Sequence, residues 1–187
     1  KKKDAVRRCA SEGYECEKIA IEKIKHFVSK DAFNIDGFGK KIVENFWKIK
    51  LIKLPQDIFK LDYKKIESLE GWGRLSVENL KYAINEKKNI SIERFIYSLG
   101  IRHIGLENAK LISKYFKSFS KFKALSTNKK YNELLNIDGI GETQINSIKN
   151  FFSNKINIDV LDQLQVILNI KDAIENNKNG KLKDKTF

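Results

Sequence analysis

Apolar positions in this chain recur mainly at intervals of three and four residues, which is the spacing of amphipathic helices. Pro55 suits the first turn of a short helix, and Ser91 can cap a helix that ends near Gly100. No convincing alternation of apolar and polar residues, as in a strand, precedes Lys181. The pattern predicts an all-α fold, with helices at 17–30, up to about 49, 55–60, 74–87, 91–100, 106–116, 118–125, 130–136, 142–152 and 156–168.

Glycine is scarce in this chain, and its positions reveal an internal repeat. Of ten glycines, six form Gly-x-Gly triplets at 37–39, 71–73 and 139–141, and a fourth site at 103–105 has His103 in place of the first glycine. When the four sites are aligned on the last glycine, apolar residues stand four before, one before, four after and seven after it. The last glycines are 34, 32 and 36 residues apart. Registered copies predict a repeated unit of helix, tight turn and helix, with the +4 and +7 residues on one helix face.

The repeated turns are candidate anion-binding sites. Glycine permits a positive φ and close approach of another group, and the free N–H groups at a helix start favour an anion. We expect a DNA phosphate there, with charge-assisted contacts from basic side chains and from the His103 ring. A turn that only forms a tight corner is the alternative. The candidate DNA-binding residues are Gly37, Gly39, Lys40, Lys41, Gly71, Gly73, Arg74, Arg102, His103, Gly105, Gly139, Gly141 and Thr143.

The net charge of +13 indicates a polyanionic partner such as nucleic acid, although the abundance of Lys, Ile and Asn also suits an AT-rich genome. Residues 1–60 carry 15 basic and 9 acidic side chains, residues 61–125 carry 13 and 7, and residues 126–187 carry 9 and 8. The fourth turn lies in this least basic third, between Asp138 and Glu142. We therefore expect it to contribute least to phosphate binding, or to bind phosphate through Thr143 and backbone groups alone.

Two cysteines make no disulfide framework for a chain of this length, so a cytoplasmic protein is the default expectation. No apolar run reaches the roughly 18–20 residues that a membrane helix needs, so no membrane partner is expected.

The turns and their flanks resemble the helix-hairpin-helix motif of bacterial NAD-dependent DNA ligases. The run 26–39 looks like the segment that enters that family's helix-hairpin-helix domain, and 69–73 and 99–105 are similar to its second and third hairpins. The resemblance extends from about residue 7 to residue 170. Residues 8–16 resemble the second half of the family's four-cysteine zinc finger, and residues 180–187 resemble the start of its BRCT domain.

The resemblance implies a ligase fragment with a zinc-finger remnant at 1–16, a helix-hairpin-helix DNA-binding domain at 17–170, and a linker and BRCT-like start at 171–187. Four hairpins would form two pseudo-twofold pairs that span the minor groove of double-stranded DNA. Cys9 and Cys16 would be half of a zinc site, which needs four ligands. The family's adenylated lysine and Lys-x-Asp-Gly motif are absent, so the fragment is expected to be non-catalytic. NAD and Mg²⁺ would serve the remaining domains of the same ligase.

Some alternatives stay open. The chain could be the tandem helix-hairpin-helix tail of another DNA repair protein, such as a nuclease subunit, or a protein-interaction scaffold. His26 could be offered as a third zinc ligand, although a packing role on its helix is favoured. Phe38 and Trp72 could stack on bases, although packing under their turns is favoured.

Overall fold

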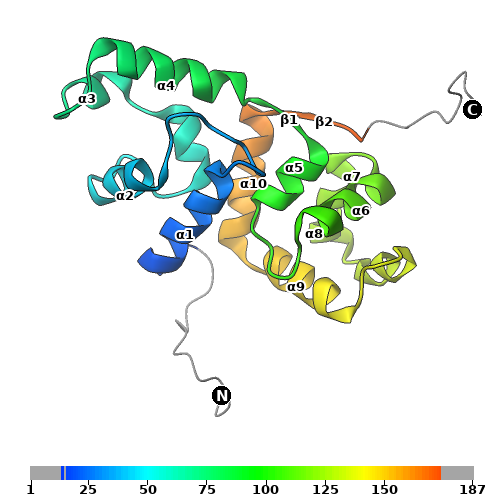
Figure 1. Cartoon of the computed structure of the whole chain (residues 1–187). Coiled ribbons are helices and arrows are strands. Elements are labelled where there is room, and N and C mark those ends of the chain that lie inside the picture. The colour runs from blue at the N-terminus through cyan, green and yellow to red at the C-terminus, as the bar shows by residue number, and fades with distance from the viewer. Residues whose placement is uncertain (1–13, 15, 174–187) are drawn as a thin grey trace, which may run out of the picture.

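The computed structural model describes residue 14 and residues 16–173, and helices dominate this part of the chain (Figure 1). The predicted all-α fold is confirmed in the main, and most predicted helix ends lie within two residues of the observed ones. In chain order the elements are α1 (Glu17–Val28), α2 (Lys40–Lys48), the 3-10 helix η1 (Pro55–Lys60), α3 (Tyr63–Glu67), α4 (Arg74–Glu86), β1 (Asn89–Ser91), α5 (Ile92–Ser98), α6 (Leu106–Phe116), α7 (Phe119–Lys123), α8 (Leu125–Asn128), the 3-10 helix η2 (Tyr131–Asn136), α9 (Glu142–Ser153), α10 (Lys155–Ile167) and β2 (Asn169–Lys171).

The four aligned sites share one turn geometry. The first position of each turn has a positive φ: +76° at Gly37, +80° at Gly71, +61° at His103 and +88° at Gly139. In each turn the next residue donates its N–H to the carbonyl oxygen three residues earlier, at N···O distances of 3.2, 3.1, 3.0 and 3.0 Å in chain order. A helix then begins directly after the last glycine, as α2, α4, α6 and α9. The expected pairing of these turns about pseudo-twofold axes stays a prediction.

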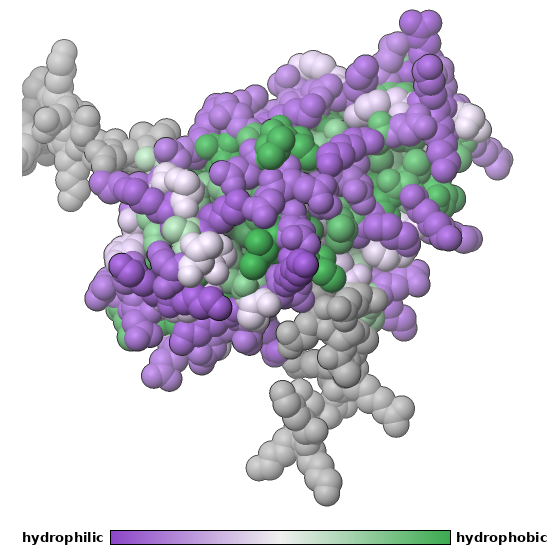
Figure 2. Space-filling view, turned by 180° about the vertical axis from the view of Figure 1, so that it is seen from behind, coloured by the Kyte–Doolittle hydropathy of each residue, from purple (hydrophilic) through white to green (hydrophobic). Residues whose placement is uncertain are grey.

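The repeated apolar positions form the core beneath the turns. The +4 residues and the +7 residues of all four units are buried, and burying each Val, Leu, Ile or Phe stabilises the fold by roughly 1.5–3 kcal/mol. Hydrophilic side chains cover most of the face in Figure 2, with apolar side chains gathered in small patches between them. The buried +4 and +7 residues are Val43, Val77, Ala109, Ile145, Phe46, Leu80, Ile112 and Ile148.

A small sheet corrects the expectation that no strand precedes Lys181. Strand β1 pairs in parallel with β2, so that Asn89, Ile90 and Ser91 lie opposite Asn169, Ile170 and Lys171. Each strand has only three residues, too few to show an alternating pattern. Ser91 does stand at the N-cap of α5, but its side chain makes no capping hydrogen bond.

The end of the described chain packs back against earlier segments. Helix α10 follows the fourth turn in sequence, yet it packs against η1, which stands between the first and second turns in sequence. Lys60 Nζ, at the end of η1, donates to Gln163 Oε1 of α10 at 3.0 Å. Beyond the sheet, Ala173 N donates to the carbonyl oxygen of Lys117 at 2.8 Å. No helix among the described residues is long and apolar enough to cross a membrane.

Candidate nucleic-acid interface

The last glycine of each of the first three turns has open space around it. Gly39, Gly73 and Gly105 have ordinary negative φ values of −74°, −106° and −80°. A Cβ atom built on any of the three would meet no heavy atom within 4 Å. Neither backbone conformation nor packing within the described chain therefore requires glycine here. As the N-cap, glycine also supplies no side-chain acceptor, so the first N–H groups of each helix remain available to an external one.

The helices after the first two turns carry an unusual charge arrangement. A helix start has a partial positive charge and is normally stabilised by an acidic residue, yet the first turns of α2 and α4 have none. Instead, Lys40 and Lys41 begin α2 and Arg74 begins α4, all with exposed side chains. Basic groups at this position repel the helix dipole. An external anion would remove that repulsion, so these two helix starts have the electrostatics of an anion-binding site.

Arg74 has a partner within its own helix, which sequence reasoning missed. Its Nε lies 2.9 Å from Glu78 Oε1, and this hydrogen bond raises the pKa of the guanidinium. The spacing of four residues is the usual one for such pairs and could have revealed it. The Arg74 side chain is still 83% exposed, so its remaining N–H groups can reach a ligand.

The third turn has a histidine where the others have glycine. His103 and Arg102 are both exposed beside the open Gly105. A positive φ is uncommon outside glycine, although histidine adopts it more readily than most residues. Asn108 Nδ2 donates to the His103 carbonyl oxygen at 3.0 Å and so holds the turn from the following helix. The first turn of α6 has an acidic residue, Glu107, which pairs with Lys110 at 2.7 Å.

The fourth turn is partly occupied by the protein itself. Gly141 N donates to Gln144 Oε1 at 3.2 Å, and a Cβ on Gly139 would lie 3.1 Å from Leu111 Cδ1. Glu142 supplies the acidic residue of the first helical turn, and Thr143 is exposed. Sequence reasoning missed Gln144, although its place three residues after the helix cap is the usual one for a reciprocal cap.

The aromatic side chains at the turns have packing roles. Phe38 is only 2% exposed, and its ring lies edge-on to Phe46 at a centroid distance of 5.6 Å. Trp72 is half-buried, and its ring lies at the same centroid distance from Phe46, in a tilted arrangement. The prediction of packing under the turn is confirmed for Phe38, whereas Trp72 packs against Phe46 of the first unit.

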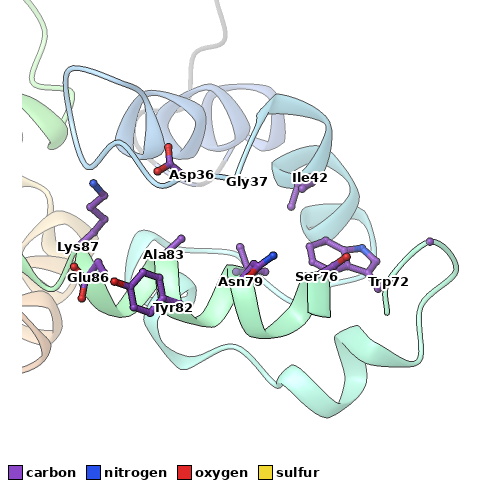
Figure 3. A pocket seen from close by; sticks show the side chains of 12 residues that line it. Asp36, Gly37, Ile42, Trp72, Ser76, Asn79, Tyr82, Ala83, Glu86 and Lys87 are labelled. Atoms are coloured by element: carbon purple, nitrogen blue, oxygen red, sulfur yellow. The ribbon is translucent and has the colours of Figure 1, made fainter. Parts of the chain in front are cut away.

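A groove separates the first turn from α4, with a cavity volume of about 830 Å³. In Figure 3, Asp36, Gly37 and Ile42 lie on one side of it and α4 runs along the other. Trp72 of the second turn lies at one end, and Glu86 and Lys87 lie at the other. Gly71 of the same turn also lines the groove. The first two turns thus border a common hollow.

The expected half zinc site is not established by the structure. Cys9 lies outside the described residues, and Cys16 is a free, half-buried cysteine. No group of three or more His, Cys, Asp or Glu side chains converges within residues 14 and 16–173. His26 instead bonds to a carbonyl oxygen of α5 through Nε2 at 2.8 Å, which confirms its packing role. Zinc binding by Cys9 and Cys16 stays a prediction.

Known proteins are similar in sequence to the parts of the chain that contain these turns. The family model of the helix-hairpin-helix motif matches residues 94–161, which contain the third and fourth turns. The whole chain is 71% identical to part of a DNA ligase from Pelagibacter ubique (strain HTCC1062). The resemblance to the DNA ligases is confirmed. DNA ligases from Rickettsia rickettsii (strain Sheila Smith) and Rickettsia bellii (strain RML369-C) are 44% and 43% identical over 97% of the chain.

The match covers only part of each ligase. The chain spans 28% of the length of each of these three relatives. The similarity therefore concerns one segment of a DNA ligase, and this segment contains the four turns described above.

Proposed function

We propose that this chain is the duplex-binding segment of a DNA ligase and that its turns hold backbone phosphates without reading base sequence. The ligase relatives and the helix-hairpin-helix match support the general role. Main-chain N–H groups at a helix start bind phosphate oxygens, which are the same for every base pair. Binding of this kind positions a duplex and leaves sequence unread.

The observation that carries the proposal is the open glycine at Gly39, Gly73 and Gly105. Serine, aspartate or asparagine would cap each helix better, and the φ values and empty space would accept them. A group outside the described chain must therefore account for glycine. A phosphate that approaches the backbone closely does so, because any side chain there would stand in its way.

Within a longer ligase, this segment would grip the duplex around a nick while other domains of the same chain carry out the reaction. NAD, Mg²⁺ and a complete zinc finger would belong to those domains, and the segment itself would be non-catalytic. Ligation of this kind serves DNA replication and repair in the cytoplasm of bacteria. These statements extend the resemblance to the whole enzyme and are part of the proposal.

A protein-interaction scaffold is the remaining competitor. The whole-chain matches to DNA ligases give the nuclease-subunit alternative no support. A scaffold would use the turns only as corners and would have no need for basic residues at the starts of α2 and α4.

Duplex binding by the whole chain tests the proposal. We expect two duplexes of unrelated sequence to bind with equal affinity in fluorescence anisotropy. The logarithm of the binding constant should fall linearly with the logarithm of the salt concentration. The triple variant Gly39→Val/Gly73→Val/Gly105→Val should stay folded, with a lower melting temperature because valine is a poorer N-cap than glycine, and should lose most of this binding. Absence of wild-type binding at low salt would favour the scaffold, and undiminished binding by the triple variant would refute the role of the turns.

A further inference from the structure

The helix before the first turn contacts the segment that enters the third turn. His26 Nε2, on α1, donates to the carbonyl oxygen of Tyr97 at 2.8 Å, and the two rings lie edge to face at a centroid distance of 4.6 Å. Gly100, just before the third turn, is so close that an added Cβ would lie 3.4 Å from His26 Cδ2. The position of α1 is therefore fixed against the backbone that leads to Gly105.

A second contact runs in the opposite direction. Arg94, on the helix before the third turn, donates from Nε to the carbonyl oxygen of Ala32 at 2.8 Å and from Nη2 to that of Lys30 at 2.6 Å. Both carbonyls belong to the segment between α1 and the first turn. The guanidinium fork is planar and rigid, so two bonds to one loop fix its position and its orientation.

The two contacts are reciprocal. Each unit sends one side chain across the seam between α1 and α5 to the backbone that precedes the other unit's turn. The side chains cross a separation of 71 residues for His26 and of 62 to 64 residues for Arg94, so they join parts of the chain that are distant in sequence. Phe33 and Phe95 meet beside this seam, at a centroid distance of 6.4 Å.

We propose that His26 and Arg94 are positioning residues that hold the first and third turns at a fixed separation, so that both bind phosphates of one duplex together. The inference rests on the proposed function, and it adds a geometric link between two turns that are 66 residues apart in sequence. When two contacts are rigidly linked, the second forms at a high effective concentration and adds to the affinity. A loose seam lowers that concentration without changing either turn.

Other contacts keep the two halves of the protein together when these bonds are removed. Helix α10 packs on η1, and β1 pairs with β2. Variants at His26 and Arg94 should therefore still fold, with a loosened seam. Lys25 provides a matched control, because among the described residues its ammonium is bonded within the first unit, to Glu22 at 2.7 Å and to Glu44 at 2.6 Å.

The experiment compares two lengths of duplex, because a link between the turns adds affinity only for a duplex that reaches both. Variants His26→Leu, Arg94→Ala and Lys25→Ala are titrated against labelled duplexes of about one helical turn and about three helical turns, near 10 and 30 base pairs. We expect His26→Leu and Arg94→Ala to weaken binding of the long duplex about tenfold and of the short one less than about twofold. Lys25→Ala should change both affinities by the same factor. His26→Gln retains an amide donor for the Tyr97 carbonyl oxygen and should restore most of the long-duplex affinity.

The outcomes separate this inference from the proposed function. If the wild-type chain binds neither duplex, the proposed function fails. If it binds the long duplex more tightly, yet Arg94→Ala and His26→Leu weaken both lengths equally, the positioning role is overturned and the turns act independently. Circular dichroism melts identify any variant that does not fold, and Arg94→Lys then replaces Arg94→Ala, since lysine cannot form the two-pronged contact.

Discussion

The first and fourth turns begin with the same four residues, Asn-Ile-Asp-Gly, and share the positive φ at the glycine and the hydrogen bond that closes the turn, but only the first is open. No atom of the described residues lies within 4 Å of a Cβ built on Gly37 or Gly39, whereas Gly139 lies beside Leu111 and the Gly141 N–H is bonded to Gln144. Two lysines follow the first turn, and a glutamate and a threonine follow the fourth. The difference agrees with the expectation, still untested, that the fourth turn contributes least to DNA binding.

The two glycines of a Gly-x-Gly turn have different roles. The first glycine provides the positive φ that any such corner needs, and both turns have it. The second glycine keeps the approach to the helix start clear, which matters only if a ligand arrives there. In the fourth turn a side chain of the same helix takes the place of that ligand.

Valine at the second glycine should produce the largest contrast. Gly39→Val fills space that a phosphate would use, so affinity for duplex DNA should fall about tenfold, the equivalent of one charge-assisted hydrogen bond. Gly141→Val should reduce affinity less than about twofold, because its N–H is already bonded. Anisotropy titrations measure both, and thermal melts verify that both variants fold. Equal reductions in affinity at the two sites would remove the distinction between the turns.

Removal of the two lysines after the first turn should weaken DNA binding but increase the stability of the folded protein. Lys40→Ala/Lys41→Ala should lower the salt slope of DNA binding by about 0.9 for each phosphate that these side chains neutralise. The same change should raise the free energy of unfolding slightly, because it removes positive charge from a positive helix end. Glu142→Ala/Thr143→Ala should leave the slope unchanged and reduce stability slightly. Salt titrations and urea unfolding test this pair, and an unchanged slope for the lysine variant would contradict phosphate binding there.

Freeing the fourth turn should make it resemble the first. Gln144→Ala removes the acceptor of the Gly141 N–H, so duplex affinity should rise about twofold while unfolding free energy falls by about 1 kcal/mol. Asn146→Ala, an exposed substitution on the same helix, serves as the control and should change neither quantity. Affinity that stays constant in Gln144→Ala would show that the cap does not limit this turn.

The smallest expected contrast is in the response to pH. The pKa of Glu44 lies below its ordinary value of 4.5, because Lys25 donates a hydrogen bond to its carboxylate. At pH values above 4.5 this bond between α1 and α2 therefore stabilises the folded protein. As pH falls through the lowered pKa, this contribution disappears. The stability difference between wild type and Glu44→Gln should therefore be present at pH 7 and vanish in acid. The difference between wild type and Gln144→Ala should stay constant over this range, because the amide cap does not titrate. Urea midpoints at several pH values give both differences.

The sequence was sufficient to predict the turns because the same local constraints occur four times in register. The contacts of Gln144 with Gly141 and of Glu78 with Arg74 were also predictable, since both spacings follow local rules for helices. The seam contacts of His26 and Arg94 were not predictable, because they depend on how helices distant in sequence pack together. The two strands were not predictable either. Three residues are too few to show a periodicity, and each strand pairs with a segment far away in sequence.

The parallel pair of β1 and β2 also has a consequence for how the chain folds. Asn89 and Asn169 are 80 residues apart, and their side chains are joined by a hydrogen bond of 2.8 Å. Closing so long a loop has a large entropy cost, while three residues of pairing give little in return. The strands should therefore pair only after the helices between them have packed. Amide hydrogen exchange at Asn169, whose N–H is bonded to the Lys88 carbonyl oxygen, would then report the last step of folding and the first step of unfolding.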